Sequence, residues 1–233
     1  MKNIEYSKMA YVYDKFYINK NYKQEVDFIT SFIKDKKCKI LDAGCGTGNH
    51  AKILYDLGYN VFGFDKSQNM VDIANSKISG NFFQADLLKV NLKEKYDVII
   101  SFFAVFNHLK NYREFKKALT NLKKLLKKDG VIVIDLHNPQ RSGEKMESFD
   151  NIFRIMQWKK CSILNKEFSK ITYIIDGKVY KTKHVFKIFK IKKLEKLVKR
   201  LGCINVNFYE NYDKSKIASQ TSKNIQLVLT NNS

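Results

Sequence analysis

The sequence of 233 residues lacks an uninterrupted apolar run of about 18 residues and a charged-then-apolar leader with a cleavage site. We therefore expect no membrane association and a cytoplasmic location. Its cysteines are few and scattered, without a C-x-x-C pair or a histidine at zinc spacing, at Cys38, Cys45, Cys161 and Cys203. This pattern predicts reduced thiols and no metal site.

Arginine is also scarce. Lysine supplies nearly all of the 43 basic residues, and the formal charge is +20. The arginines are Arg113, Arg141, Arg154 and Arg200. Nucleic-acid recognition favours the guanidinium fork, and many lysines lie among leucines on amphipathic segments, as outer helix faces do. A nucleic-acid partner is therefore the less favoured interpretation of the charge.

No internal repeat or low-complexity linker divides the chain, so we expect a single domain, as a monomer or homodimer. Within it we expect an N-terminal helical cap at 1–35, a core at 36–138 and a β-rich insertion at 139–190. A helix and strands at 191–233 would complete the sheet.

Short apolar runs alternate with segments of helical period. The predicted strands are 39–43, 61–64, 82–84, 96–102 and 131–134, and the predicted helices are 22–33, 50–57, 69–78 and 112–127. A turn is predicted at 128–130. Buried strands that alternate with helices predict an α/β fold, a Rossmann-like, doubly wound, mostly parallel sheet with helices on both faces.

The pattern changes after Pro139. We predict strands at 153–158, 171–175 and 179–189, with Asp176-Gly177 as a hairpin turn. A helix at 190–201 and strands near 204–209 and 225–229 follow. The insertion is expected to form a lid over the carboxyl ends of the parallel strands, where open α/β sheets bind ligands.

A glycine-rich loop, Asp42-Ala43-Gly44-Cys45-Gly46-Thr47-Gly48, joins a predicted strand to a helix. Its glycines allow a sharp turn and the close approach of a ligand to backbone amides. Asp65 ends the next strand, where a carboxylate can accept both ribose hydroxyls. Asp86 ends the third, where it can accept from an adenine amine, and Met70 offers an apolar surface to the adenine face.

This ordered set, within residues 36–136, resembles the class I S-adenosylmethionine-dependent methyltransferase family. The resemblance implies S-adenosylmethionine as cofactor and S-adenosylhomocysteine as product. Gly44, Gly46 and Gly48 would border the methionine portion, with Asp42 and Cys45 in the same loop. Asp65 would bind the ribose, Met70 and Asp86-Leu87 the adenine, and Ser101 would lie on the sulfonium side. The Tyr13-Asp14 segment and the long hairpin resemble the subgroup that acts on small molecules, including amino-sugar N-methyltransferases.

A dehydrogenase is the competing interpretation of the glycine loop. Two observations oppose it: Gly48-Asn49 lacks the third small residue of a pyrophosphate loop, and we find no Tyr-x-x-x-Lys pair that would support hydride transfer. Lys66, beside Asp65, remains a candidate cofactor contact, with a solvated lysine as the alternative.

Candidate catalytic residues follow the fourth and fifth strands. Asn107 and His108 lie in the first loop, and His137 and Asn138 follow the fifth strand. A histidine can act as a general base near neutral pH, which a hydroxyl acceptor needs more than an amine. We expect His50 and His184 at the surface.

Aromatic residues add candidates near the site. Tyr13 and Tyr17 would share a helix face and close over the cofactor, or pack the helix on the sheet. Trp158, Phe153 and Tyr173 would line an acceptor pocket, with core burial as the alternative reading.

The expected function is methyl transfer to a small-molecule N or O acceptor. The alternatives are an RNA or protein methyltransferase that uses the basic surface, and a non-catalytic S-adenosylmethionine-binding protein. No Asn/Asp-Pro-Pro-aromatic motif follows the fourth strand, which disfavours nucleobase N-methylation.

Overall fold

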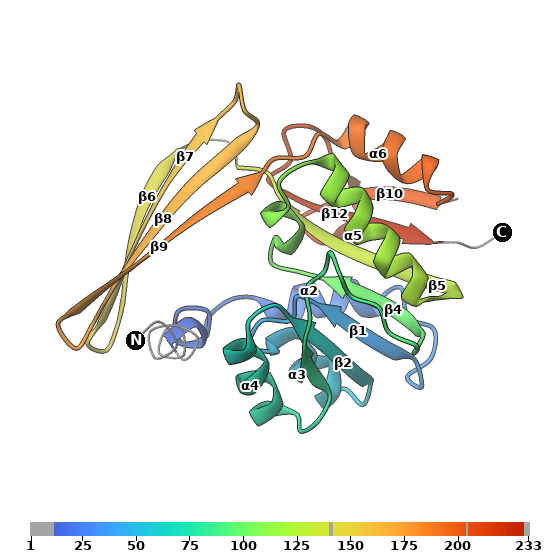
Figure 1. The fold of residues 1–233 in the computed structure, drawn as a ribbon, viewed down its shortest axis with the longest axis horizontal. Coiled ribbons are helices and arrows are strands. Elements are labelled where there is room, and N and C mark those ends of the chain that lie inside the picture. The colour runs from blue at the N-terminus through green and yellow to red at the C-terminus, as the bar shows by residue number, and fades with distance from the viewer. Residues whose placement is uncertain (1–11, 140–141, 204, 231–233) are drawn as a thin grey trace.

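The computed structural model describes residues 12–139, 142–203 and 205–230. Its main layer is an eight-stranded sheet with the order β11-β10-β12-β5-β4-β1-β2-β3 (Figure 1). The strands are β1 (Lys39–Ala43), β2 (Asn60–Asp65), β3 (Phe82–Gln84), β4 (Tyr96–Ser101), β5 (Leu126–His137), β10 (Asn205–Glu210), β11 (Asp213–Ile217) and β12 (Asn224–Thr230). Strands β1 to β5 are parallel to one another, whereas β12 runs antiparallel to β5, and β10 runs antiparallel to both β12 and β11.

Helices cover both faces of this sheet. They are α2 (Tyr22–Thr30), α3 (Asn49–Asp56), α4 (Gln68–Lys77), the 3-10 turn η1 (Val105–His108), α5 (Tyr112–Leu125) and α6 (Ile191–Arg200). One core cluster lies under α5 and α6, and a second lies under α2, α3 and α4. The sequence-based prediction of a doubly wound α/β fold is therefore confirmed.

Helix α5 shows how sequence period sets these layers. Phe115, Ala118, Leu119, Leu122 and Leu125 form one buried stripe at helical spacing. The Asn111 side chain accepts a hydrogen bond from the backbone N–H of Glu114 and caps the first turn.

The predicted turn at 128–130 is wrong, because these residues belong to β5 and α5 ends at Leu125. Tyr96 pairs with Leu126 and Val98 with Val131, so residues 127–130 form a register shift and not a chain reversal. Gly130 fits there because a Cβ would lie 2.7 Å from the Leu126 side chain.

A separate four-stranded antiparallel sheet projects to one side of the main layer in Figure 1, and we call it the arm. It contains β6 (Gly143–Phe149), β7 (Ile152–Cys161), β8 (Lys166–Ile175) and β9 (Lys178–Lys187). The predicted hairpin turn between β8 and β9 is confirmed, with positive φ at Asp176 and Gly177. Strands β6 and β11 were not predicted, because each is short and mostly polar.

The arm meets the main body at the carboxyl ends of β4 and β5. The Asn107 side chain, after β4, donates to the backbone oxygen of Lys187 in β9. Near the other end of the arm, residues 12–16 are helical and Val12 packs against Ile152, Tyr173 and Ile175. The prediction of two N-terminal helices matches residues 12–16 and α2, while residues 1–11 lie outside the described part of the chain. Within the described ranges, no helix is long and apolar enough to cross a membrane.

Candidate cofactor and acceptor site

The glycine loop joins β1 to α3 and depends on positive backbone φ angles. These are 83° at Gly44, 54° at Gly46 and 77° at Gly48, which precedes the first residue of α3. A Cβ at Gly44 would lie 2.7 Å from Val105, so this glycine lets the loop after β4 approach closely. A Cβ at Gly46 would meet nothing within 4 Å, so Gly46 borders open space.

Asp65 stands at the end of β2 beside this loop. One carboxylate oxygen accepts the Gly46 N–H at 3.0 Å and the other accepts the Ser67 N–H at 2.9 Å. Burial raises the pKa of Asp65 above its ordinary value, although the backbone hydrogen bonds act in the opposite direction.

Asp42 lies within β1 and is only 2% exposed. Its Oδ2 atom has no hydrogen-bond partner among the described residues. Burial, and then the charge of Asp65, raise the pKa of Asp42 to about 8. An unsatisfied buried polar atom costs roughly 1–3 kcal/mol, so a ligand that donates a hydrogen bond or brings a positive charge would be favoured here.

S-adenosylmethionine fits these residues. It carries an ammonium that can favour ionisation of Asp42 and pair with its carboxylate, and ribose hydroxyls that match an acidic side chain such as Asp65. The open space at Gly46 leaves room for the cofactor beside the backbone amides. The assignment of individual contacts to the glycines and acids stays a prediction.

On the predicted adenine side, Asp86 already has partners within the chain. Asp86 accepts the Leu88 N–H at 2.9 Å and pairs with Lys66 at 3.1 Å. Burial opposes its ionisation, but these partners outweigh it and lower the pKa of Asp86. Leu87 is buried, and Met70 is half-buried in the first turn of α4. The Lys66 side chain is 81% exposed, which matches the alternative of a solvated lysine better than a cofactor contact.

Asp14 fastens the N-terminal segment to the glycine loop. Its carboxylate accepts hydrogen bonds from the Thr47 hydroxyl at 2.5 Å and the Asn49 amide at 3.0 Å, and it pairs with Lys77 at 2.6 Å. Sequence reasoning named the Tyr13-Asp14 segment but assigned Asp14 no role, because nothing in the local pattern places it above residues 47–49.

The chain leaves β4 in a strained conformation. Phe103 and Ala104 have φ angles of 63° and 59°, which are unfavourable for residues other than glycine. The Phe103 ring contacts Tyr13 and Tyr17 at centroid distances of 6.0 and 4.9 Å. Desolvation raises the pKa of Tyr13 well above its usual 10, so its phenol stays protonated and can donate a hydrogen bond.

Ser101 differs from the expected contact on the sulfonium side. It is completely buried, and its hydroxyl donates to the backbone oxygen of Ala43 at 2.7 Å. Its side chain therefore ties the end of β4 to β1. Cys45 is also buried, and burial raises the pKa of its thiol.

Asp135 in β5 contacts the strained segment at Phe103 and Ala104 by a hydrogen bond to Ala104. No role was predicted for Asp135 from the sequence. Its carboxylate accepts from the Ala104 N–H at 3.3 Å, the Tyr212 hydroxyl at 3.2 Å and the Gln226 amide at 3.1 Å. Burial raises the pKa of Asp135 despite these donors. The signal in the sequence was a lone carboxylate between Ile134 and Leu136.

The prediction that His50 lies at the surface is wrong. His50 is 6% exposed, and its Nε2 atom lies 2.5 Å from a Glu25 carboxylate oxygen. Desolvation opposes ionisation of Glu25, but His50 and Lys20 outweigh it and lower the pKa of this carboxyl. The first turn of α3 faces α2, so His50 is covered by the N-terminal segment.

Three histidines gather around Phe186 where the arm meets the ends of β4 and β5. The ring centroids of His108, His137 and His184 lie 4.6, 6.4 and 6.0 Å from that of Phe186. His184 is half-buried and contacts His108, which corrects its predicted surface position. Among the described residues, no group of three or more His, Cys, Asp or Glu side chains could hold a metal ion.

The two predicted bases differ in their surroundings. Desolvation, and then the charge of His184, lower the pKa of His108 to about 4, whereas the residue as a whole is exposed. His137 Nε2 lies 3.3 Å from the carboxylate of Glu167, which is 5% exposed and belongs to β8. Sequence reasoning missed Glu167, since only pairing across the arm brings it to β5.

The Asn107 side chain in η1 joins this turn to β5 and β9 through hydrogen bonds. Its amide nitrogen donates to the backbone oxygens of His137 at 2.9 Å and Lys187 at 2.7 Å, and its oxygen accepts the His137 N–H at 2.9 Å. Asn138 likewise donates to the backbone oxygens of Gln220 and Ser222. Both amide groups are occupied in positioning backbone, which leaves little for a substrate.

The aromatic candidates on the arm are divided between its faces. Trp158 and Tyr173 lie on the face that carries His184, whereas Phe153 lies on the opposite face and is 44% exposed. Trp158 and His184 contribute to a hollow of about 610 Å³ at the arm. Tyr173 is buried against the N-terminal helical segment, as the alternative reading expected.

Comparisons with known proteins agree with this geometry. A family model described as a methyltransferase domain matches residues 40–130. The chain is 34% identical to uncharacterized protein MJ1252 of Methanocaldococcus jannaschii over 183 residues, 78% of this chain and 68% of that protein. It is 35% identical to an uncharacterized methyltransferase of Alkaliphilus oremlandii over 115 residues, 48% of this chain and 52% of that one.

A solved structure covers nearly the whole chain. It is an S-adenosylmethionine-dependent methyltransferase from Clostridium acetobutylicum, with a TM-score of 0.82 and 22% identity, over 98% of this chain and 99% of that one. Together with the glycine loop, Asp42 and Asp65, these matches establish that the chain belongs to the class I family and is an S-adenosylmethionine-dependent methyltransferase.

Proposed function

We propose that the enzyme transfers the methyl group to a nitrogen or oxygen atom of a small molecule. The observation that carries this proposal is the group of His108, His137 and His184 around Phe186, where the arm meets the ends of β4 and β5.

S-adenosylmethionine, when bound, supplies an activated methyl group, so the protein has to orient the acceptor, exclude water and receive a proton. His108 and His137 are the candidates for the last task; the His108 ring is neutral at pH 7, but its lowered pKa also makes it a weak base. The carboxylate of Glu167 can hold the His137 ring in one orientation, as in other carboxylate-histidine pairs. Tyr13 and Phe103 lie above the end of β4 and can shield the reacting groups from water.

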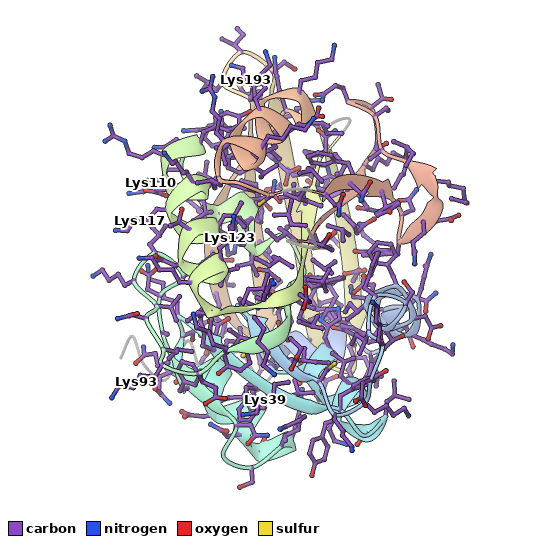
Figure 2. The ribbon with its side chains drawn as sticks, turned by 90° about the vertical axis from the view of Figure 1, so that its right-hand side faces the viewer. Lys39, Lys93, Lys110, Lys117, Lys123 and Lys193 are labelled. Atoms are coloured by element: carbon purple, nitrogen blue, oxygen red, sulfur yellow. The ribbon has the colours of Figure 1, made fainter. Side chains whose placement is uncertain are left out.

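The alternative acceptor, RNA or protein, rests on the charge of +20. Figure 2 shows Lys39, Lys93, Lys110, Lys117, Lys123 and Lys193 spread from the bottom to the top of one side of the molecule. Some of these lysines are already engaged: Lys39 pairs with Glu94 at 2.5 Å, and Lys123 donates to the backbone oxygen of Leu201. A dispersed distribution favours solubility over a defined polyanion groove.

The test is a turnover assay that measures S-adenosylhomocysteine release and follows a radiolabelled methyl group. The purified chain is incubated with panels of small amines and alcohols, with bulk RNA or with protein. Label in a small product, reduced by His108→Asn or His137→Asn, supports the proposal. Label in RNA or protein contradicts it, and cofactor binding without turnover in any panel favours a non-catalytic binding protein.

A further inference from the structure

Arg154 in β7 is a buried guanidinium that the chemistry described above does not use. It is only 2% exposed and lies on the face of the arm that is turned toward the N-terminal helical segment. Its centre lies 4.3 Å from the ring centroid of Phe16 and 4.7 Å from that of Tyr17. A guanidinium tolerates such a site because it stacks on aromatic faces and is weakly hydrated.

Only part of this guanidinium has a partner. The Nε atom donates to Glu147 at 3.0 Å, and one terminal nitrogen also pairs with Glu147. The other terminal nitrogen, NH1, has no hydrogen-bond partner among the described residues. Buried polar groups are nearly always hydrogen-bonded, so the unpaired NH1 atom of Arg154 requires an explanation.

The local charge balance points to an anion. Glu147 is shared between Arg154 and Lys145, whose ammonium lies 2.5 Å from the same carboxylate. Two cations on one carboxylate leave a net positive charge beside the free N–H groups. A planar carboxylate or a phosphate offers the acceptor oxygens that NH1 lacks.

The position of Arg154 connects it to the reaction site. Arg154 contacts Tyr17, and Tyr17 contacts both Tyr13 and Phe103 at the end of β4. An anion at NH1 would therefore lie beside Phe16 and Tyr17, and Tyr17 connects this position to Phe103 after β4.

We propose that Arg154 anchors an anionic group, a carboxylate or phosphate, of the methyl acceptor. This inference rests on the proposed small-molecule function and narrows the substrate class to anionic amines or alcohols. Glu147 is then a resident counter-ion that holds the guanidinium, while NH1 remains free for the substrate.

The test uses the full chain saturated with S-adenosylhomocysteine, titrated with sodium acetate or inorganic phosphate at constant ionic strength. Ligand-dependent thermal stability gives the apparent Kd for each anion. Arg154→Gln and Arg154→Lys remove the free N–H pair, and Arg113→Gln on α5 is the matched control, being an exposed arginine away from the arm. Glu147→Gln removes the competing carboxylate.

We expect Arg154→Gln and Arg154→Lys to weaken anion binding on the order of tenfold or more, with Arg113→Gln unchanged. Glu147→Gln should tighten it, a direction that misfolding cannot imitate. Acetate and phosphate distinguish the two anion classes. Wild-type binding of neither anion, or equal affinity in wild type and Arg154→Gln, overturns the inference. Affinity for S-adenosylhomocysteine is measured separately, so its loss would count against the cofactor site and not against Arg154.

Discussion

The hydroxyl of Thr47 donates a 2.5 Å hydrogen bond to the carboxylate of Asp14, which joins the glycine loop to a segment 33 residues earlier in the chain. Asn49 and Lys77 bind the same carboxylate. Asp14 and its three partners lie outside the strands, so we expect this contact to open without loss of strand pairing.

Replacing Asp14 by Asn should speed cofactor dissociation, because the amide loses the ion pair with Lys77 while it keeps nearly the same shape. Stopped-flow measurement of S-adenosylhomocysteine release tests this. Asp27→Asn is the control, since Asp27 forms an exposed pair with Lys23 on α2. If S-adenosylhomocysteine dissociates at the same rate from both variants, the contact between Asp14 and the glycine loop does not retain the cofactor.

Asp65→Ala should weaken S-adenosylmethionine binding by roughly 1.5–3 kcal/mol, because buried ribose hydroxyls lose a charged acceptor. Calorimetric titration measures the change. Asp72→Ala on α4 removes an exposed carboxylate nearby and should have little effect. An unchanged affinity in Asp65→Ala would sink the assignment of this residue to the ribose.

Asp42 should make the cofactor-free protein less stable as pH rises. Its pKa is about 8 in the folded chain, compared with about 3.9 in an unfolded one. As pH rises, the unfolded chain therefore loses this proton at a lower pH than the folded chain does. The stabilisation that the protonated carboxyl contributes is largest below about pH 4 and falls to its minimum near pH 8. Urea unfolding at several pH values should show a steeper decline for wild type than for Asp42→Asn. Parallel pH profiles would contradict a neutral Asp42.

Asn107→Ala should lower stability strongly, by about 2–4 kcal/mol, because it leaves two backbone oxygens and one N–H without their partner. Cofactor affinity should change little. Asn121→Ala, which loses one bond to the Leu87 oxygen, is the matched comparison and should cost less. Thermal unfolding measures the loss of stability in both variants. An equal loss would contradict the proposed role of Asn107 in joining β5 and β9 to the segment after β4.

Local patterns in the sequence were sufficient for much of the fold. The apolar runs at 39–43, 61–64 and 96–102 predicted three of the parallel strands, and Asp176-Gly177 predicted the hairpin turn. Spacing along the chain also predicted Asp65 and Asp86 at the ends of successive strands, and the structure has Asp65 at the end of β2 and Asp86 just after β3.

The remaining site residues depend on contacts between distant segments. Glu167 reaches His137 only because β8 pairs within the arm, and Arg154 is buried only because the N-terminal segment covers it. His50 has a surface pattern within α3 and is buried by Glu25 of α2. Such long-range contacts leave no periodic mark in the sequence.

The strand order has a consequence for how the molecule is assembled. Strand β12, the last described strand, lies between β5 and β10 and not at an edge. A growing chain therefore holds β5 with one open flank until β12 has emerged from the ribosome, and open strand flanks are templates for aggregation. The step that completes this sheet joins residues about ninety positions apart, such as Asp135 and Gln226. The rate of folding should be limited by this late, non-local pairing of β12 with β5. Before that pairing the chain is most prone to aggregation, and chaperones should bind it most at this stage.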